Sequence, residues 1–287
     1  MVDIDPVRMA KIRALESIDS IYTGCHWSIY PLPQYINRQS YHIAFIWGKY
    51  FEVFLDKEIV RKKFIIGYLP DYLINKKIRD NKNRTFTVTY FDNLSANDLL
   101  ASDHNNYMIL ELLVNLVKKY KSFILNVKLK RLYDIGYIDY IINMEKKYPK
   151  QIHVFPKGKN CKTYMPSKIS RESDLAIGIN FSTAIGETVF SGVTSFYANF
   201  PKIQNDFLSK NLGKFVFSSL EDLEGAITDQ MNNKGVKYNS IKKAHLEIDP
   251  FQDGKAAKRV SNILDNTHKL FTSGNTSKQV LDRISDC

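Results

Sequence analysis

Strand-like and helix-like segments alternate along the chain from about residue 85 onward, and this alternation limits the fold more than any other feature. The expected strands cover 86–90, 123–128, 152–155, 175–179, 194–199 and 215–218. The expected helices cover 107–120, 135–148, 166–171, 182–191 and 220–231. No polar residue interrupts 175–179, as is usual for strands covered on both faces. The sequence therefore predicts the doubly wound α/β class, a mainly parallel Rossmann-like sheet with helices on both sides.

The N-terminal part of the chain follows a different pattern. It holds an expected helix, two expected strands, a short helix and a third apolar run, at 6–18, 20–24, 43–47, 50–54 and 64–67. These are too few strands for an independent α/β domain of normal size. We expect residues 1–83 to form a partial α/β segment with a polar linker, and residues 84–287 to form a Rossmann-like domain.

The C-terminal stretch predicts one more helix, which closes this second domain. The residues 249–260 read DPFQDGKAAKRV and open a helical pattern that continues to about residue 271. Asp253 is the expected N-cap, because a short carboxylate can accept from the first free backbone N–H groups. Gly254 would then occupy the first helical position.

The chain is basic, with 41 Lys and Arg against 30 Asp and Glu, a formal charge of +11. Such a surface can attract a polyanion, an anionic membrane face or a phosphate-bearing molecule. The Lys residues, however, are scattered in twos and threes near the ends of expected helices, which favours simple solvation of most charges. We predict no nucleic-acid partner.

The cysteines and the apolar runs indicate the compartment. Three cysteines lie far apart without metal-ligand spacing, which is typical of a reducing environment. The first residues show no basic stretch followed by an apolar run, and no run approaches the ~18 apolar residues of a membrane span. We expect a cytoplasmic protein, either free or peripherally associated with the inner face of the membrane.

The strongest candidate site lies where the strand 175–179 ends and the next helix begins. Ser182 and Thr183 stand at that junction, where free backbone N–H groups and the helix dipole favour phosphate. Gly186 would allow a ligand to approach, and Glu187 lies one turn into the helix, where a carboxylate can accept ribose hydroxyls. An ordinary N-cap and a solvated Glu explain each residue singly, but the set in this context favours a ligand site.

The segment 173–199, SDLAIGINFSTAIGETVFSGVTSFYAN, resembles an element of GT-B glycosyltransferases of bacterial surface and capsular polysaccharide synthesis. It is also similar to related glycerophosphotransferases and nucleotide-sugar 2-epimerases. The stretches IWGKY at 46–50 and IGY at 66–68 look like the crossing from an acceptor domain to a donor domain. The residues 247–259, EIDPFQDGKAAKR, look like the closing helix of surface-carbohydrate enzymes. The resemblance covers the chain from about Ile43 onward.

This resemblance implies a glycosyltransferase that moves a sugar from a nucleotide-sugar donor to a polysaccharide or lipid-linked acceptor. Residues 84–287 would bind the donor, with its diphosphate and ribose on the strand–Ser/Thr–helix–Glu element, and residues 1–83 would be acceptor-side. Two alternatives stay open: a non-catalytic nucleotide-binding scaffold, and a nucleotide-sugar epimerase. The resemblance does not distinguish UDP-linked from CMP-linked donors, and it implies no cofactor besides this substrate.

The short acceptor-side segment departs from the family pattern, since such enzymes begin with a complete first Rossmann domain. The chain is therefore expected to be a fragment of a longer enzyme, or a reduced protein whose missing domain comes from a partner chain. The sequence has no cluster of His, Cys or carboxylates with metal-ligand spacing and no Asp-x-Asp element, so we predict metal-independent transfer. It also lacks the Gly-rich motifs typical of dinucleotide and P-loop sites.

Further candidate donor-binding residues follow other expected strands. Asp92 and Asn93 follow the first strand, in a loop where GT-B phosphates often lie, although an Asx residue that starts a loop is equally expected. Lys128 and Lys130 close the second strand and could neutralise a diphosphate; a solvated strand end is the alternative.

Two histidines are also candidates. His153 begins the sequence HVFPKGK, whose turn at Lys157 and Gly158 could contact the nucleotide base through backbone groups. His26 follows an expected strand and is the candidate general base, since imidazole titrates near neutral pH. A packed histidine is the plainer interpretation of both.

Overall fold

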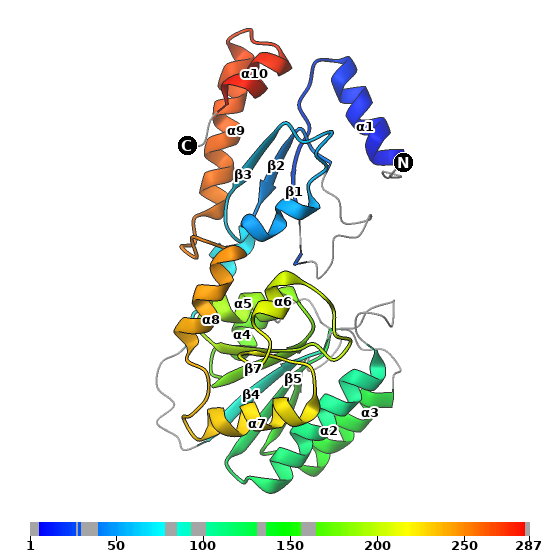
Figure 1. Cartoon of the computed structure of the whole chain (residues 1–287), viewed down its shortest axis with the longest axis vertical. Coiled ribbons are helices and arrows are strands. Elements are labelled where there is room, and N and C mark those ends of the chain that lie inside the picture. The colour runs from blue at the N-terminus through cyan, green and yellow to red at the C-terminus, as the bar shows by residue number, and fades with distance from the viewer. Residues whose placement is uncertain are drawn as a thin grey trace. The chain divides into compact units, whose positions relative to one another are not determined.

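The computed structural model describes residues 6–26, 28–29, 40–77, 85–92, 102–130, 136–155 and 165–284. These residues form two compact units (Figure 1). The first unit consists of Met1–Leu73 together with Ala244–Cys287, and the second unit is Ile74–Lys243.

The second unit is built on a six-stranded parallel sheet. Its strands are β4 (Phe86–Phe91), β5 (Phe123–Lys128), β6 (Ile152–Phe155), β7 (Leu175–Ile179), β8 (Thr194–Ala198) and β9 (Val216–Phe217). They lie in the order β6-β5-β4-β7-β8-β9, and every neighbouring pair is parallel. The predicted doubly wound α/β class is confirmed.

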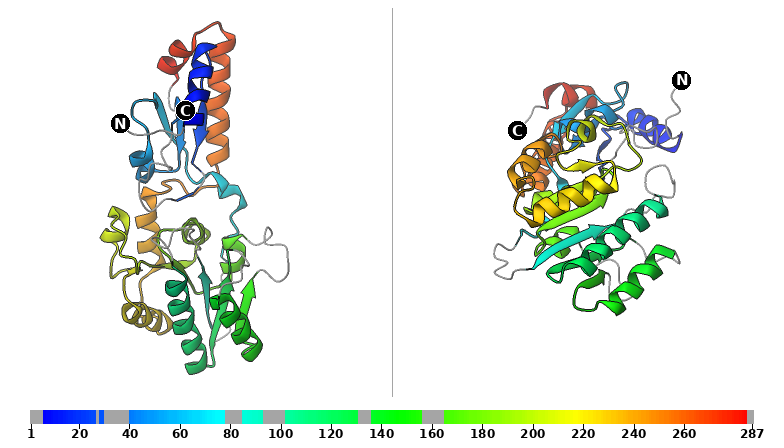
Figure 2. Two further views of the ribbon diagram at one scale, coloured as in Figure 1. Left: turned by 90° about the vertical axis from the view of Figure 1, so that its right-hand side faces the viewer. Right: turned by 60° about the horizontal axis from the view of Figure 1, so that its bottom comes forward.

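Helices cover both faces of this sheet, as Figures 1 and 2 show. The helices of this unit are α2 (Asp103–Lys119), α3 (Gly136–Lys147), α4 (Pro166–Ser170), α5 (Thr183–Ser191), α6 (Asp206–Lys210), α7 (Leu220–Met231) and α8 (Tyr238–Ala244). Helices α2 and α3 pack on β5 and β6, whereas α5 packs on β7 and β8. The sequence pattern did not predict α6 and α8, which are short and carry few buried apolar residues.

The helix boundaries follow local chemistry. Helix α2 begins four residues earlier than expected, because the Ser102 side chain accepts a hydrogen bond from the Asn105 backbone N–H and caps it. Helix α5 ends as predicted at Gly192, whose φ of 103° is the left-handed conformation that glycine adopts readily.

The first unit contains a three-stranded parallel sheet of β1 (Thr23–Cys25), β2 (Ile43–Ile46) and β3 (Lys62–Ile65), in that order. Its helices are α1 (Pro6–Ser17), the short η2 (Lys49–Phe54), η3 (Leu69–Leu73) and η5 (His245–Glu247), and the C-terminal α9 (Ala256–Thr272) and α10 (Ser277–Arg283). The core of this unit combines Ile43, Phe45, Phe64 and Ile66 of the sheet region with Ile263 and Ile284.

The C-terminal residues therefore pack in the first unit, not in the second as the expected 84–287 domain implied. The physical reason is that the apolar face of α9 covers the β2–β3 sheet, with Ile263 buried against it. The start of α9 also differs from the expectation. Gly254 has a φ of +75° and is not helical, and the helix begins at Ala256, whose backbone N–H donates to the Asp71 carboxylate at 3.1 Å.

Arg259 holds the start of α9 in place. Its guanidinium donates to the Ile66 carbonyl oxygen at 3.2 Å, pairs with the Asp253 carboxylate, and lies 3.6 Å from the centroid of the Phe251 ring. Asp253 thus binds a side chain of the helix instead of serving as its N-cap.

We predict that Arg259→Met destabilises the first unit by about 1–3 kcal/mol, because the variant loses the carbonyl contact, the ion pair and the cation–π contact together. Both tryptophans, Trp27 and Trp47, belong to this unit, so tryptophan fluorescence during denaturant unfolding reports on it. The control is Lys258→Met at the exposed neighbouring position, with an expected change within about 0.5 kcal/mol. Equal effects of the two variants would contradict the anchoring role of Arg259.

Candidate functional site

The centre of the sheet in the second unit is a topological switch point. Strands β4 and β7 are neighbours, but the chain leaves β4 toward β5 and leaves β7 toward β8, on opposite sides. Phe91 lies opposite Gly178, so Asp92 and Asn180 leave the sheet at the same edge. In open α/β sheets ligands bind in the crevice that such diverging connections leave at the carboxyl ends of the strands.

Helix α5 begins at this edge. Ser182 is its N-cap residue, with extended backbone, but its side chain makes no capping hydrogen bond. Ser182 and Thr183 are both half-buried, which leaves part of the helix N-terminus accessible. Unpaired backbone N–H groups of a first helical turn, together with the helix dipole, favour an anion at such a position.

A glycine allows this helix to lie close to the sheet. A Cβ atom on Gly178 of β7 would come within 2.6 Å of the Ile185 side chain, so glycine is required for the observed packing. Gly186, which the sequence analysis expected to admit a ligand, is buried within α5, and its backbone N–H donates to the Ser182 carbonyl oxygen at 3.2 Å. The geometry thus fixes the helix N-terminus relative to the strand end.

Asn180 is a feature of this edge that the sequence analysis missed. It is 1% exposed, its φ is +55°, and its backbone N–H donates to the Ala198 carbonyl oxygen at 2.9 Å. Within the described part of the chain, neither polar atom of its side-chain amide has a hydrogen-bond partner. A buried amide without partners is costly, and contact with a bound molecule would remove that cost.

Glu187 connects α5 to α4. It is 3% exposed, and one of its carboxylate oxygens accepts the Ser167 backbone N–H at 2.9 Å, in the first turn of α4. A carboxylate at a helix N-terminus is stabilising because it satisfies a free donor and complements the dipole. The structure therefore gives Glu187 a positioning role, and its predicted contact with ribose stays a prediction.

Asp92 ties the loop after β5 to the end of β4. Its carboxylate accepts hydrogen bonds from the Lys130 backbone N–H and, at 3.0 Å, from the Tyr137 hydroxyl of α3. Burial raises the pKa of Asp92 to about 6, although these hydrogen bonds and the charges of Lys128 and Lys130 oppose the shift. Asp92 therefore connects the end of β4 to the residues after β5 and to α3 at the carboxyl edge of the sheet.

The two lysines after β5 lie where the sequence placed them, near the carboxyl edge. Lys128 is half-buried, and its ammonium donates to the Leu129 carbonyl oxygen at 2.6 Å. Lys130 is exposed, while its backbone is held by Asp92. Both charges act on Asp92, which places them close to this edge of the sheet.

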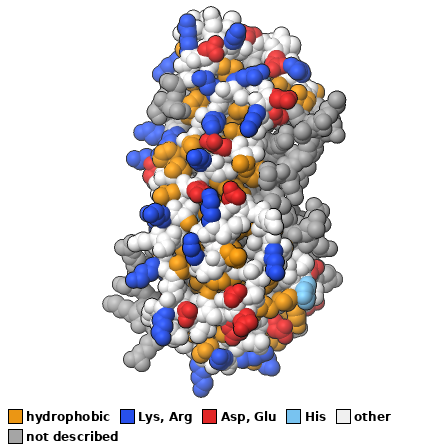
Figure 3. Space-filling model, viewed as in Figure 1, with side chains coloured by type: hydrophobic (Ala, Val, Ile, Leu, Met, Phe, Trp, Pro, Cys, Tyr) orange, Lys and Arg blue, Asp and Glu red, His pale blue; other side chains and the backbone are white. Residues whose placement is uncertain are grey.

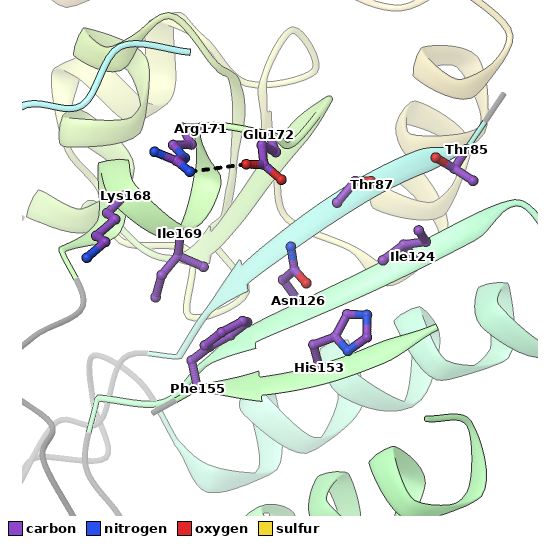
Figure 4. A pocket seen from close by; sticks show the side chains of 10 residues that line it. All are labelled: Thr85, Thr87, Ile124, Asn126, His153, Phe155, Lys168, Ile169, Arg171 and Glu172. Atoms are coloured by element: carbon purple, nitrogen blue, oxygen red, sulfur yellow. Dashed lines mark hydrogen bonds and ion pairs between the residues drawn. The ribbon is translucent and has the colours of Figure 1, made fainter. Parts of the chain in front are cut away.

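His153 lies away from this edge, on a face of the sheet. It is opposite Asn126 on β5 and lines a cavity of about 430 Å³. Figure 4 shows that the floor of this cavity comes from β4, β5 and β6 and one wall from α4 and the turn that follows it. In that turn Arg171 and Glu172 form an ion pair of 3.3 Å. His153 is thus separated in the sheet from the α5 N-terminus.

The structure contradicts the prediction that His26 is a general base. The ring is 3% exposed and stacks on Phe51 at a centroid distance of 3.8 Å. The Trp47 backbone N–H donates to Nε2 at 3.2 Å, which places the ring proton on Nδ1, 3.0 Å from the Ser28 carbonyl oxygen. Burial lowers the pKa of His26 to about 3. Both nitrogens are engaged in packing the first unit.

Asn93, Lys157 and Gly158 lie outside the described residues. Within the described ranges, no three His, Cys, Asp or Glu side chains come together as metal ligands would. Over the same residues, no helix combines the length and the apolar character needed to cross a bilayer. On the face shown in Figure 3, Lys and Arg side chains are spread over the surface with Asp and Glu side chains among them.

Comparisons with known proteins give similarity of fold only. No protein-family model and no curated protein matches the sequence. The S. aureus MnaA–UDP co-structure matches with a TM-score of 0.51 at 10% identity, over 81% of this chain and 61% of that one.

Two further solved structures are similar. A protein named as a UDP-N-acetylglucosamine 2-epimerase from Listeria monocytogenes has a TM-score of 0.49 at 13% identity, over 77% of this chain and 55% of that one. TarM has a TM-score of 0.48 at 14% identity, over 86% of this chain and 50% of that one. The chain spans 55–61% of the first two structures. It shares the Rossmann-like α/β fold of the MnaA structure.

The Asp92 contacts predict a pH dependence of stability. Because its pKa is raised from 3.8 to about 6, the folded protein binds more protons than the unfolded chain between pH 4 and 6. The contribution of Asp92 to the free energy of unfolding therefore decreases as pH rises through that window, by about 1–3 kcal/mol. Denaturant unfolding at several pH values should show that the free energy of unfolding of the parent decreases with pH in this window. In Asp92→Asn this pH dependence should be absent.

A second variant tests the cause. The Tyr137 hydroxyl stabilises the charged form of Asp92, so Tyr137→Phe should move the same slope to higher pH. A slope that is unchanged in Asp92→Asn would contradict the assignment.

Proposed function

We propose that the second unit binds a nucleotide sugar at the carboxyl ends of β4 and β7, and that the protein transfers the sugar to a polysaccharide or lipid-linked acceptor. The observation that carries this proposal is the accessible N-terminus of α5 beside the buried, unpartnered amide of Asn180, at the switch point of a parallel sheet. An anionic ligand is what such an edge binds best.

In this proposal the diphosphate lies on Ser182 and Thr183. The helix N-terminus and the ammonium groups of Lys128 and Lys130 offset the negative charge that develops on the leaving nucleotide. Charge stabilisation of this kind requires no tightly bound metal. The side-chain amide of Asn180 can both donate and accept, and contact with the ligand would satisfy it.

Glu187 would have two roles. Each carboxylate oxygen can accept more than one hydrogen bond, so the Ser167 contact leaves capacity for a ribose hydroxyl. A carboxylate held in place and already removed from water binds a hydroxyl without further ordering cost.

The proposal assigns no catalytic base, since His26 is engaged in packing. The site of action would be the cytoplasm, with peripheral association at the inner face of the membrane. A capsular or other cell-surface glycan is the expected product.

Two other functions compete. A UDP-N-acetylglucosamine 2-epimerase by name is among the structures of similar fold, and epimerisation needs no acceptor. A non-catalytic scaffold would bind the nucleotide and release nothing. Incubation with UDP-sugars and CMP-sugars, followed by NMR, separates these outcomes. Released or transferred sugar supports the transferase, an inverted sugar centre without release supports the epimerase, and an unchanged donor supports the scaffold.

Thr183→Val should weaken binding of a nucleoside diphosphate roughly ten- to a hundredfold and leave nucleoside binding unchanged. The reason is that a hydrogen bond to a charged oxygen contributes about 1.5–3 kcal/mol. Calorimetry with UDP and uridine, and with CDP and cytidine, measures both effects. The matched control is Thr228→Val on α7, which should bind like the parent. Parent-like binding of UDP and CDP by Thr183→Val would remove this residue from the site.

Glu187→Gln should weaken the binding of nucleosides and of nucleoside diphosphates by a similar factor, because the proposed partner of Glu187 is the ribose that both ligands carry. The glutamine carbonyl can still accept the Ser167 N–H, so the contact between α5 and α4 persists. Thermal unfolding should therefore change little while calorimetry shows the loss. A variant that unfolds easily but binds normally would leave Glu187 with its positioning role alone.

A further inference from the structure

A second cavity, of about 500 Å³, lies on the first unit beside η2 and β3. Its lining residues are Glu52, Val53, Leu55, Lys57, Val60, Arg61, Lys62 and Lys63. Four of these side chains are cationic and one is anionic. Such an excess of one charge in a surface depression attracts anions.

Most of this positive charge is available to a ligand. Lys63 pairs with Glu52 at 2.9 Å. Lys57, Arg61 and Lys62 form no ion pair with any described residue. Lys57 and Arg61 are exposed. Asp56, between Leu55 and Lys57, is 3% exposed and accepts the Glu58 backbone N–H, so it does not line the cavity.

Apolar side chains, some of them exposed, lie beside these cations. In η2, Phe51 and Phe54 face the core, and the helical spacing turns Val53 outward, where it is 65% exposed. Leu55 and Val60 are half-buried in the cavity lining. On β3, Ile65 is 37% exposed, two residues beyond Lys63 on the same face of the strand. A soluble polyanion gains nothing from such apolar groups, whereas a bilayer surface does.

We propose that this basic cavity docks the first unit on an anionic lipid bilayer. The cationic side chains would bind the phosphates of lipid head groups, and Val53 would enter the boundary between head groups and acyl chains. Docking would be peripheral. The docking proposal rests on the proposed function in one respect: docking would bring the protein to a lipid-linked acceptor.

Co-sedimentation with vesicles tests the proposal. The parent chain should bind vesicles of phosphatidylglycerol mixed with phosphatidylcholine, should bind pure phosphatidylcholine poorly, and should dissociate as salt is raised. Lys57→Gln combined with Arg61→Gln should lower the partition coefficient about tenfold or more, since each cation near an anionic surface adds substantially to binding. Val53→Ser should lower it several-fold at unchanged charge.

A matched control separates a local site from net charge. Lys146→Gln combined with Lys150→Gln removes the same charge from exposed positions of the second unit, and it should bind vesicles like the parent. Equal loss in the two double variants would overturn the proposal, as would parent-like vesicle binding by Lys57→Gln with Arg61→Gln. Binding of inorganic polyphosphate without binding of vesicles would also overturn it, in favour of a soluble polyanion.

The same variants distinguish failure of the membrane-docking proposal from failure of the nucleotide-binding proposal. Lys57→Gln with Arg61→Gln should bind nucleoside diphosphates like the parent in calorimetry, because its changes lie outside the second unit. Loss of vesicle binding with intact nucleotide binding assigns the cavity to docking alone.

Discussion

The parallel pairing of β4 with both β5 and β7 is the constraint on which the rest of the second unit depends. A parallel strand must be reached by a crossover, and crossovers on either side of β4 and β7 run over opposite faces. The two connections therefore diverge at the carboxyl edge, between the ends of β4 and β7. The residues that we place at the proposed ligand edge lie at or just after the ends of β4, β5 and β7, or in the first two turns of α5.

Buried polar contacts hold this edge in one arrangement. The Glu187 carboxylate fixes α4 to α5, and the Asp92 carboxylate fixes α3 and the end of β5 to β4. These contacts are made within the protein, before any ligand binds. Asn180 differs, because its amide is equally buried but has no partner among the described residues. The described contacts thus fix the polar side chains of this edge before binding and leave the Asn180 amide to be satisfied, and preorganisation of this kind lowers the cost of binding.

The sequence predicted the second unit well, because runs such as Leu175–Ile179 and the apolar stripe of α2 reflect burial directly. It did not predict that α9 packs on β2 and β3, since the contacts of Arg259 with Ile66 join segments far apart in the chain. His26 illustrates a second limit. A histidine after a strand reads as a possible base, and only the position of Phe51 and Trp47 shows that it is packed. Asn180 was missed because nothing in a sequence marks an unpartnered amide.

The central claim is that a nucleotide binds at the start of α5, and amide hydrogen exchange with and without UDP or CDP tests it most directly. The account predicts that a saturating nucleotide slows exchange most strongly in peptides covering 179–187, with smaller effects at the ends of β4 and β5. Exchange that is slowed instead in peptides lining the cavity of His153, or in no part of the second unit, would contradict the account.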